Sequence, residues 1–322
     1  MSGIAALGEV IIDFTYLENE NGRPMFKQNA GGAPANVECM AAKLGVKTGF
    51  IGKIGKDMFG GYLRRVLSDC GVDTRGLISD KNFFTTLAFV RRNEEGDRDF
   101  VFYRNDKISA DLNLSYSEID LTVIDDCDIF HFGALSLTCE PTRSATMNAI
   151  EYAKLKGKII SYDPNWREDL WESKEAAVKA MRSVLQYVDI IKLSEKELQI
   201  LTGCDTLLPS VAYLLKAGVK MICITQGAKG CIIASRKGIE RYSGFDTPIT
   251  DTLGSGDSFY AGFLYKLLDI GKPLEELTPE DKEELAVFAN ACGALSASKK
   301  GTIPSMPVLK SVEELIALRE DK

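Results

Sequence analysis

The stretch Asp251–Phe259, which reads DTLGSGDSF, places two glycines and a serine directly before an aspartate, and an amphipathic helical pattern begins there. Small residues let backbone N–H groups converge, and the N-terminus of a helix adds partial positive charge. Such a place binds an anion, most often phosphate. Because like charges repel, Asp257 cannot help to hold that anion and is better suited to act as a base. The loop and Asp257 together predict transfer of a phosphoryl group onto a hydroxyl.

The same stretch also fits an ordinary helix cap, because Asp and Ser at a helix start are common and contribute about 1 kcal/mol. Four further clusters favour the chemical interpretation, since they combine glycines or charged groups with polar side chains at predicted strand ends and helix starts. They are Gly31–Asn36, Asp163–Arg167, Lys192–Glu197 and Thr225–Gly230. Each of them alone could be a turn or a cap.

Two of these clusters could hold a polar small molecule. Gly31 and Gly32 allow a ligand to approach the backbone closely, and Asn36 offers both hydrogen-bond donors and acceptors. Asn165 and Arg167 supply an amide and an anion clamp directly after a predicted strand.

The other two clusters suit a nucleotide and its metal ion. Glu195 or Glu197 could hold hydrated Mg²⁺, although both carboxylates would also be favourable in the first turn of a helix. The cluster Thr225–Gly230 is predicted to be a tight turn between two strands, suited to a nucleotide edge or merely to a hairpin.

The sequence also excludes several kinds of site. It contains no G-x-x-x-x-G-K-[ST] motif, which argues against a P-loop kinase, and neither His-Arg-Asp nor Asp-Phe-Gly of the protein kinases. His131 is the only histidine, so a multi-histidine metal site is excluded. Because it lies in the apolar run Ile129–Phe132, His131 is predicted to be a packed core residue rather than a catalytic one.

From residue 120 onward, short apolar runs typical of strands alternate with amphipathic helical stretches. The predicted strands are Ile129–Phe132, Ile159–Tyr162, Ile190–Leu193, Met221–Thr225 and Cys231–Ala234. The predicted helices are Thr142–Lys156, Lys174–Gln186, Glu195–Leu201 and Ser210–Ala217. This alternation predicts an α/β fold whose mainly parallel central sheet is covered by helices on both faces. In such sheets, ligands bind beyond the carboxyl ends of the strands.

The first 110 residues follow a different pattern. Ile4–Asp13 is predicted to be one central strand, and Phe14–Ala30 contains no convincing helix. Leu87–Arg92 and Asp99–Arg104 alternate apolar and polar residues across the turn Glu94–Asp97, which predicts a hairpin. We therefore expect a single domain, residues 1–322, with a small β-sheet lid formed by about residues 14–30 and 84–108.

The composition is that of an ordinary globular protein, with 45% apolar and 26% charged residues. The formal net charge of −7 suggests no basic surface for nucleic acid. No secretory signal and no membrane-spanning segment is apparent, and the eight scattered cysteines form no Cys-x-x-Cys pair. Buried reduced thiols are expected, and with them a cytoplasmic protein.

Taken together, these clusters resemble those of the ribokinase-like (PfkB) family of carbohydrate kinases, and within it the bacterial and plant fructokinases. The resemblance runs from Gly8-Glu9 to Ile303-Pro304. Its most specific element is Asp-Thr-x-Gly-x-Gly-Asp, paired with the glycine-rich cluster near the N-terminus. Ser255 stands where alanine is commoner, a change that retains the backbone N–H. The resemblance implies a ribokinase-like fold, ATP and Mg²⁺ as cofactors and, as in many relatives, a monovalent cation such as K⁺.

The resemblance and the clusters together imply roles for individual residues. Asp257 is the expected base, and the backbone of Gly254, Ser255 and Gly256 is the expected anion hole for the transferred phosphoryl group. The residues expected to bind the sugar are Asp13, Gly31, Gly32, Asn36, Arg104, Asn165, Arg167 and Asp257. Those expected on the nucleotide side are Lys192, Ser194, Thr225, Gly227, Gly230, Gly254, Gly256 and Asn290.

Two carboxylates are expected to act on cations. Glu197 lies in an element that resembles the Asn-x-x-Glu motif of the family, with Ser194 in place of the asparagine, and is expected to hold Mg²⁺ through water. Asp251, with the loop around Lys299–Ser305, corresponds to the place where many relatives bind a monovalent cation.

The resemblance favours one sugar over others. Ribokinases carry a glutamate on the strand that matches Phe130–Leu135, and this chain has none there, which argues against ribose. The run Asp97–Arg104 resembles fructokinases and implies phosphorylation of D-fructose to fructose 6-phosphate. Kinases for 2-keto-3-deoxygluconate share much of this pattern, and Arg104 and Arg167 could serve either substrate.

Two alternatives come from other classes. A sugar-binding regulator without activity is disfavoured by the intact Gly-x-Gly-Asp loop. A nicotinamide-dependent dehydrogenase is disfavoured because Leu7–Val10 stands where Gly-x-Gly-x-x-Gly would follow the first strand. Because lid strands in this family often pair across a dimer, we expect a homodimer, with a sugar and ATP as the small-molecule partners and neither nucleic acid nor membrane.

Overall fold

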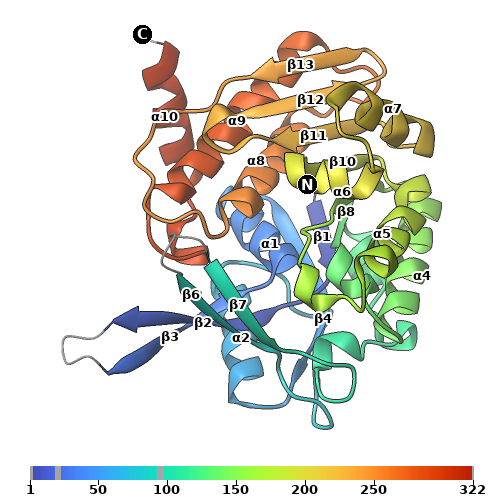
Figure 1. Cartoon of the computed structure of the whole chain (residues 1–322), viewed down its shortest axis with the longest axis vertical. Helices are drawn as coiled ribbons and strands as arrows, with labels where there is room; N and C mark the ends of the chain where they lie inside the picture. The colour runs from blue at the N-terminus through green and yellow to red at the C-terminus, as the bar shows by residue number, and fades with distance from the viewer. Residues whose placement is uncertain (1–2, 19–22, 93–97, 321–322) are drawn as a thin grey trace.

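The computed structural model describes residues 3–18, 23–92 and 98–320, and its main feature is a large central sheet (Figure 1). Nine strands of the described chain form it, in the order β13-β12-β11-β10-β9-β8-β1-β4-β5. They are β1 (Gly3–Leu7), β4 (Lys47–Gly55), β5 (Leu77–Asp80), β8 (Ile129–Gly133), β9 (Ile159–Asp163), β10 (Ile190–Ser194), β11 (Met221–Thr225), β12 (Cys231–Ser235) and β13 (Gly238–Tyr242). The predicted mainly parallel α/β sheet is confirmed, since only the β11–β12 and β12–β13 pairs are antiparallel.

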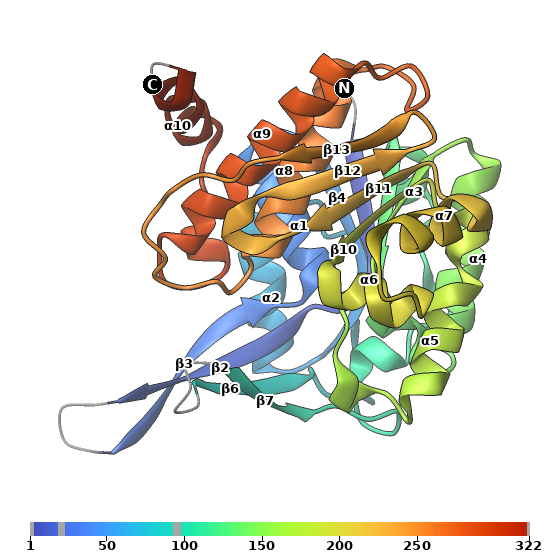
Figure 2. The same cartoon turned by 45° about the horizontal axis from the view of Figure 1, so that its top comes forward.

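Helices cover both faces of the sheet, and each face has its own apolar core (Figure 2). One core contains residues of α1 (Ala33–Lys43), α2 (Met58–Asp69), α8 (Ser255–Ile270), α9 (Pro279–Ala297) and α10 (Leu309–Glu320). The other contains residues of α3 (Thr122–Asp125), α4 (Thr142–Leu155), α5 (Lys174–Ser183), α6 (Glu195–Thr202) and α7 (Leu207–Ala217). Helices on both faces bury the central strands, which is why those strands are mostly apolar.

The order of the sheet reverses at β1. From β1 the chain continues to β4 on one side, whereas β8, β9 and β10 follow in order on the other side. In open α/β sheets such a reversal opens a crevice beyond the carboxyl ends of the strands, where ligands bind. Asp163 at the end of β9 and Ser194 at the end of β10 are therefore brought to the same edge as the start of α8.

The helix α8 is the element that carries the glycine-rich loop, and its ends follow local rules. It begins after Gly254, whose φ of 73° lies in the left-handed region, and it ends at Gly271, whose φ is 66°. In its middle, Gly262 permits close packing on α9, because a Cβ there would lie 2.6 Å from the Sγ of Cys292. The start of α8 is thus fixed by a packed helix pair.

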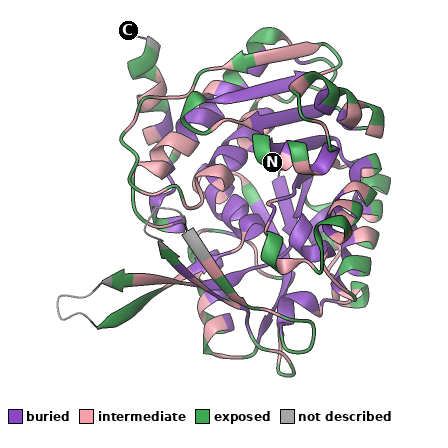
Figure 3. Ribbon diagram, in the orientation of Figure 1, coloured by how far each residue is buried: buried purple, intermediate pink, exposed green. Residues whose placement is uncertain are grey.

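A second, four-stranded sheet forms the lid, in the order β3-β2-β6-β7. Its strands are β2 (Ile11–Glu18), β3 (Pro24–Gly31), β6 (Leu87–Arg92) and β7 (Arg98–Tyr103). The predicted hairpin is confirmed, since β6 and β7 pair in antiparallel register, although its predicted turn Glu94–Asp97 lies outside the described residues. The β2–β3 ribbon extends away from the rest of the molecule and is largely exposed towards its end (Figure 3).

The prediction of one strand over Ile4–Asp13 is wrong. The chain leaves the main sheet after Leu7 and enters the lid at Ile11, so the run forms two strands in two different sheets. The break lies where the backbone passes close to α1: a Cβ on Gly8 would lie 2.6 Å from the Cγ of Pro34. The lid therefore begins three residues earlier than residue 14, the start that the sequence suggests.

The single histidine is a core residue, as predicted. His131 on β8 is 0% exposed, and its Nδ1 lies 3.1 Å from the Oγ of Ser161, which in turn lies 2.7 Å from the hydroxyl of Tyr260. Burial lowers the pKa of His131 to about 3, so the ring stays neutral at physiological pH. The eight cysteines are all free thiols, five of them buried.

Among the described residues, no single helix has the length and apolar character needed to cross a membrane. The helices α6 and α7 meet that requirement only as a pair, and they are bent by 61° to each other.

Candidate active site

Two adjoining cavities lie at the crevice beyond the strand ends. The first has a volume of about 660 Å³ and is lined from the core by Asp257 and Lys192 and from the lid by Asp13, Phe100 and Phe102. The second has a volume of about 550 Å³ and lies between the β11–β12 turn and the helices α8 and α9. Both cavities are lined by Ile249, Thr252 and Gly256. The start of α8 therefore separates two spaces, each large enough for a small molecule.

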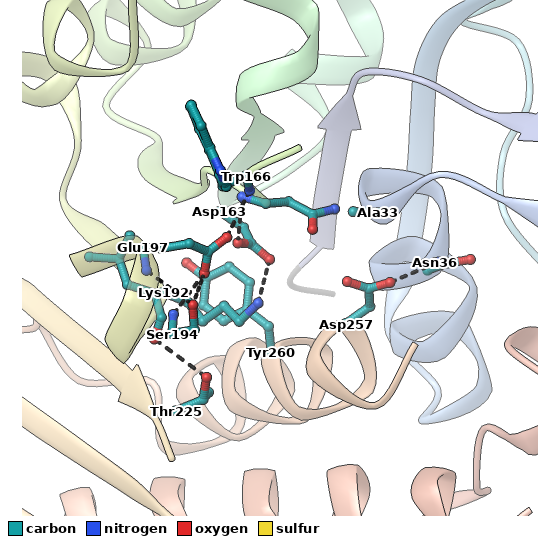
Figure 4. Close-up of polar contacts among 12 residues, drawn as sticks. Ala33, Asn36, Asp163, Trp166, Lys192, Ser194, Glu197, Thr225, Asp257 and Tyr260 are labelled. Carbon is teal, nitrogen blue, oxygen red and sulfur yellow. Dashed lines mark hydrogen bonds and ion pairs between the residues drawn. The ribbon is translucent and has the colours of Figure 1, made fainter. Parts of the chain in front are cut away.

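Asp257 lies in the first turn of α8 and lines the first cavity. Its Oδ2 accepts a hydrogen bond of 2.8 Å from the side-chain amide of Asn36 on α1, as Figure 4 shows. Burial raises the pKa of Asp257 above its ordinary value, and Lys192 and the Asn36 amide oppose that rise. A carboxylate whose pKa is moved towards neutrality is a suitable general base.

The predicted anion hole is the loop that precedes Asp257. The first N–H groups of a helix have no partner within it and are available at its N-terminus. The N–H of Ser255 donates to the carbonyl of Thr252 at 3.3 Å, whereas Gly254 and Gly256 line the first cavity. Gly254 has no room for a side chain, because a Cβ there would lie 2.4 Å from the Cγ2 of Thr302. Ser255 donates from its Oγ to the carbonyl of Thr252 at 2.8 Å, which stabilises the loop.

A buried ion pair lies directly beside this loop. The Nζ of Lys192 on β10 is 2.8 Å from the Oδ2 of Asp163 on β9, and both side chains are at most 9% exposed. A Cβ on Gly256 would lie 3.4 Å from the same Nζ, so the ammonium group faces the start of α8. Burial raises the pKa of Asp163 to about 6, although Lys192 opposes the rise. The pair places a positive charge where an anion would meet the helix.

Glu197 and Ser194 form a capping box at the start of α6. The Oε2 of Glu197 accepts from the backbone N–H and the Oγ of Ser194, at 2.7 Å each, and its Oε1 accepts from the backbone N–H of Trp166 at 2.8 Å. Burial raises the pKa of Glu197. The charge of Lys192 and these hydrogen bonds lower it by more than burial raises it, so the pKa lies below the ordinary value. The carboxylate is therefore charged.

The arrangement is compatible with Mg²⁺, although no set of three or more His, Cys, Asp or Glu side chains within the described residues forms a metal cage. Mg²⁺ keeps several of its waters and usually binds through one or two carboxylates and substrate phosphates. A charged carboxylate oxygen has lone pairs left for a metal-bound water after it accepts these hydrogen bonds. Glu197 itself lines neither cavity, so any contact with the ion would pass through water.

The predicted sugar residues Asp13, Gly32 and Asn36 line the first cavity. Gly32 precedes α1 with a φ of 107°, a conformation that favours glycine. Gly31 does not line the cavity but makes room for the carboxylate of Asp13, since a Cβ on Gly31 would lie 2.0 Å from its Oδ2. Asp13 is 7% exposed, so its carboxylate is enclosed at the junction of lid and core.

Asn165 and Arg167 also line the first cavity. Asn165 has a φ of 45°, which is unusual for a residue other than glycine, and its N–H donates to the Oδ1 of Asp163 at 3.2 Å. The guanidinium of Arg167 lies 5.8 Å from the ring centroid of Phe100 on β7. This contact connects the core to the lid over the cavity.

Arg104 is placed differently from the other predicted sugar residues. Its side chain is 3% exposed and donates from Nε to the Oδ2 of Asp111 at 2.7 Å. It lies behind the cavity wall, because it donates to the carbonyl of Leu135, which lines the cavity, at 3.0 Å.

The predicted nucleotide residues divide between the two cavities. Thr225, Gly227, Gly230 and Asn290 line the second, whereas Lys192 lines the first and Ser194 lines neither. The tight turn between β11 and β12 is confirmed. A Cβ on Gly230 would lie 2.1 Å from the carbonyl oxygen of Tyr242, so only glycine fits there.

Asp251 holds two loops together beside the first cavity. Its Oδ1 accepts from the N–H of Leu253 and its Oδ2 from the N–H of Gly301, both at 3.1 Å. The loop around Gly301 is therefore beside Asp251, as the predicted cation site requires.

The sequence alone missed several cavity residues. Glu9 lies two residues beyond the end of β1, a position that the predicted single strand Ile4–Asp13 concealed, and its Oε1 accepts from the N–H of Ala33 at 3.1 Å. Phe100 and Phe102 alternate on one face of β7, a pattern that predicts a shared face but not what it faces. Thr302 belongs to the loop Lys299–Ser305 that the resemblance places near Asp251, but its contact with Gly254 is formed only by the tertiary fold.

Comparison with known proteins finds one family and close relatives that match almost the whole chain. Residues 1–309 match the family described as pfkB family carbohydrate kinase. A probable fructokinase-5 from Arabidopsis thaliana is 41% identical over 321 residues, which cover 97% of each chain.

Two solved structures are similar over almost the whole chain. A fructokinase from Xylella fastidiosa with bound ATP has a TM-score of 0.89 and 29% identity, with 99% of each chain covered. A fructokinase double mutant from Vibrio cholerae, solved with fructose, ADP and potassium ion, has a TM-score of 0.87 and 28% identity, with 98% of each chain covered.

Proposed function

Because the chain belongs to the pfkB family of carbohydrate kinases, we propose that it transfers the γ-phosphoryl group of ATP to D-fructose and forms fructose 6-phosphate and ADP. Full-length relatives named as fructokinases support this choice of sugar, as does a neighbouring structure solved with fructose and ADP. Fructose is the preferred substrate candidate, ahead of 2-keto-3-deoxygluconate, as the sequence predicts.

The observation that carries the proposal is the position of Gly256 between two cavities, with the adjacent Asp257 lining the first of them. In this arrangement the first cavity takes the sugar, because acceptors for hydroxyl groups such as Asp13 and Asn36 line it. The second cavity takes the nucleotide, beside the glycine turn after Thr225. The γ-phosphoryl group then lies at the start of α8, within reach of a sugar hydroxyl on the other side.

The mechanism follows from these positions. Asp257 accepts the proton of the attacking hydroxyl, and the Asn36 amide orients its carboxylate for this step. The N–H groups at the start of α8 stabilise the charge on the transferred group, and Lys192 adds a buried positive charge beside them. Since phosphoryl transfer has a loose transition state, positioning and electrostatics account for most of the catalysis.

Two cations complete the proposed site. Mg²⁺, bound to ATP and held through water by Glu197, would neutralise phosphate charge. A monovalent cation such as K⁺ is proposed beside Asp251, because the hydrogen bond from Gly301 shows that the loop Lys299–Ser305 lies against this carboxylate, as the resemblance implies. The cytoplasmic location predicted from the sequence remains a prediction.

We also propose a homodimer formed through the lid. The lid exposes large apolar side chains with no core to cover them: Phe26 is 47%, Val101 56% and Tyr103 61% exposed. A projecting β-ribbon with apolar exposed residues commonly forms an interface. Light scattering on the purified protein tests this, and Phe26→Lys should shift a dimer towards monomer.

The decisive test of the function is ADP release with ATP and Mg²⁺ in the presence of fructose, 2-keto-3-deoxygluconate, ribose, glucose or adenosine. Turnover with fructose well above that with the other acceptors is expected. Turnover with fructose no better than with the others would overturn the proposal, and no turnover with any acceptor would favour a sugar-binding regulator.

A further inference from the structure

Each of the three nitrogens of the Arg104 guanidinium donates a hydrogen bond to the protein. It follows β7 and reaches from the lid to the core, where NH2 donates to the carbonyl of Leu135 at 3.0 Å and NH1 to the Oγ1 of Thr138 at 3.3 Å. Its Nε donates to the Oδ2 of Asp111 at 2.7 Å. Every nitrogen of the group that could clamp an anionic substrate therefore has a protein acceptor.

The buried carboxylate of Asp111 forms an ion pair with Arg104. It lies in a single helical turn, Ala110–Leu112, with a side chain that is 2% exposed. Its other oxygen, Oδ1, accepts a hydrogen bond from the hydroxyl of Thr86, a neutral donor. The charge of Asp111 is thus balanced mainly by Arg104, and the buried pair is locally neutral.

This neutral pair lies at the wall of the first cavity. Leu135, which accepts from Arg104, lines the cavity, and so does Glu9, which is 4% exposed. Burial raises the pKa of Glu9 to about 7, and Arg104 lowers it while Asp111 raises it. Arg104 and Asp111 therefore both act on a carboxyl group of the cavity wall, with opposite signs.

The remaining charges of the cavity are unfavourable for an anion. Four acidic and two basic residues line it. Of the two basic ones, Lys192 is paired with Asp163 and faces the phosphoryl side, whereas Arg167 lies against Phe100. A sugar carboxylate would lose its hydration and meet four acidic side chains, with Arg167 as the one cation on the sugar side to offset that cost in part.

We propose that Asp111 is a specificity-determining residue, which withholds the Arg104 cation from the sugar cavity and so selects an uncharged ketose over a sugar acid. The inference rests on the proposed function and assigns the basis of its substrate preference. Without the Asp111 charge, the guanidinium behind Leu135 would be an unpaired cation at the cavity wall. Arginine in that state is the preferred partner of a carboxylate.

The test compares kcat/KM for 2-keto-3-deoxygluconate and for fructose in the wild type and in Asp111→Asn. The variant keeps the size and a hydrogen-bonding oxygen and removes the charge. The ratio of acid to fructose should rise at least about tenfold, the effect of one charge-assisted hydrogen bond. The double variant Arg104→Gln/Asp111→Asn restores neutrality and should return the ratio to that of the wild type.

A matched control separates this effect from general damage. Asp189 is also a buried aspartate, 4% exposed and paired with Lys154 at 2.9 Å, but it lines neither cavity. Asp189→Asn should leave the substrate ratio unchanged. An unchanged ratio in a folded Asp111→Asn protein that still phosphorylates fructose would overturn the inference and leave the proposed function intact.

A second measurement needs only the wild type, in case Asp111→Asn does not fold. 3-Deoxyfructose is the neutral counterpart of 2-keto-3-deoxygluconate, with CH₂OH in place of the carboxylate. As competing ligands, the acid should bind at least about tenfold more weakly than the neutral sugar. Equal or tighter binding of the acid would overturn the inference, whereas a wild type that prefers the acid as substrate would overturn the proposed function as well.

Discussion

The side-chain amide of Asn36 donates a 2.8 Å hydrogen bond to the carboxylate of Asp257, across 221 positions of sequence. The contact joins the N-terminal turns of α1 and α8, the two helices that frame the first cavity. It holds one oxygen of the carboxylate, so that the other can face a hydroxyl group. The geometry of the proposed base therefore depends on a residue from the opposite end of the chain.

Replacement of the proposed base should abolish turnover without abolishing binding. Asp257→Asn keeps the shape and removes the proton acceptor, so kcat should fall about 10²- to 10⁴-fold while the affinities for ATP and fructose change little. Steady-state kinetics and calorimetric titration measure the two effects. Asp57→Asn at the start of α2, which lines neither cavity, is the control and should remain active. Near-normal turnover of Asp257→Asn would remove Asp257 as the base.

The Asn36 amide should set the pH at which the enzyme becomes active. Its hydrogen bond lowers the pKa of Asp257, which burial raises. In Asn36→Ala the pKa should rise, so the base stays protonated to higher pH and the acid limb of kcat/KM for the sugar moves to higher pH. Asn36→Asp adds a like charge and should move it further. An acid limb that moves to lower pH in either variant would contradict this role.

Loss of the Lys192 charge should affect stability and catalysis separately. Lys192→Met leaves Asp163 buried without its partner, which should cost about 3–5 kcal/mol of unfolding free energy. Lys192→Met/Asp163→Asn should recover much of that stability but not the activity, because the charge beside the anion hole is still missing. The control is Lys282→Met, which removes an equally buried ammonium from its pair with Glu240, 2.8 Å away and 28% exposed, outside both cavities. The Lys282→Met protein should lose stability but keep its kcat. Restored activity in Lys192→Met/Asp163→Asn would show that the role of Lys192 is only structural.

Gly254 should be needed for the shape of the anion hole. An alanine at its φ of 73° costs about 1 kcal/mol, and its methyl group would also meet Thr302. The displaced N–H groups should lower kcat about 10²- to 10³-fold. Gly271→Ala imposes the same strain at the other end of α8, where a Cβ would lie 3.8 Å from the carbonyl oxygen of Leu268. Gly254→Ala should lose more thermal stability because of the contact with Thr302, but equal losses in kcat would contradict the special role of Gly254.

Local sequence predicted the elements whose signals are local. The strands from Ile129 to Ala234 are apolar runs bounded by turn residues, and each was found to within about two residues, the usual uncertainty of strand boundaries. The start of α8 was predicted from its glycines. In contrast, Ile4–Asp13 is equally apolar on both sides of its break, so nothing in its pattern shows that the chain changes sheets at Gly8.

The site was predictable only in part, because several of its contacts join residues that are far apart in the sequence. Asp257 and Gly254 belong to a short motif, whereas the contacts of Asp257 with Asn36 and of Gly254 with Thr302 are formed by the tertiary fold. Arg104 shows the limit most clearly. Its sequence context suggests a substrate ligand, but its charge is paired with Asp111, a residue with no local signal of its own.

The carboxylate of Glu197 caps α6 and is also proposed to hold Mg²⁺ through water, and the two roles can be separated by experiment. The capping box with Ser194 uses Oε2, and Oε1 accepts from the backbone N–H of Trp166, so both carboxylate oxygens already have protein donors. Glu197→Gln retains a hydrogen-bonding oxygen but loses the charge, so a purely structural role predicts a stability loss of about 1 kcal/mol and no other change. A role in holding Mg²⁺ through water predicts in addition that the Mg²⁺ concentration needed for half-maximal activity rises about 10- to 100-fold.

The chain supplies a matched control for this comparison. Asp281 forms the equivalent capping box with Thr278 at the start of α9, and it lines neither cavity. Asp281→Asn should lower the melting temperature in the same way and leave the Mg²⁺ requirement unchanged. If Glu197→Gln behaves like Asp281→Asn in both measurements, then the carboxylate only stabilises α6. If only Glu197→Gln changes the Mg²⁺ requirement, then the capping box also fixes a charge for the metal, and the fold of α6 and the chemistry of the site depend on the same side chain.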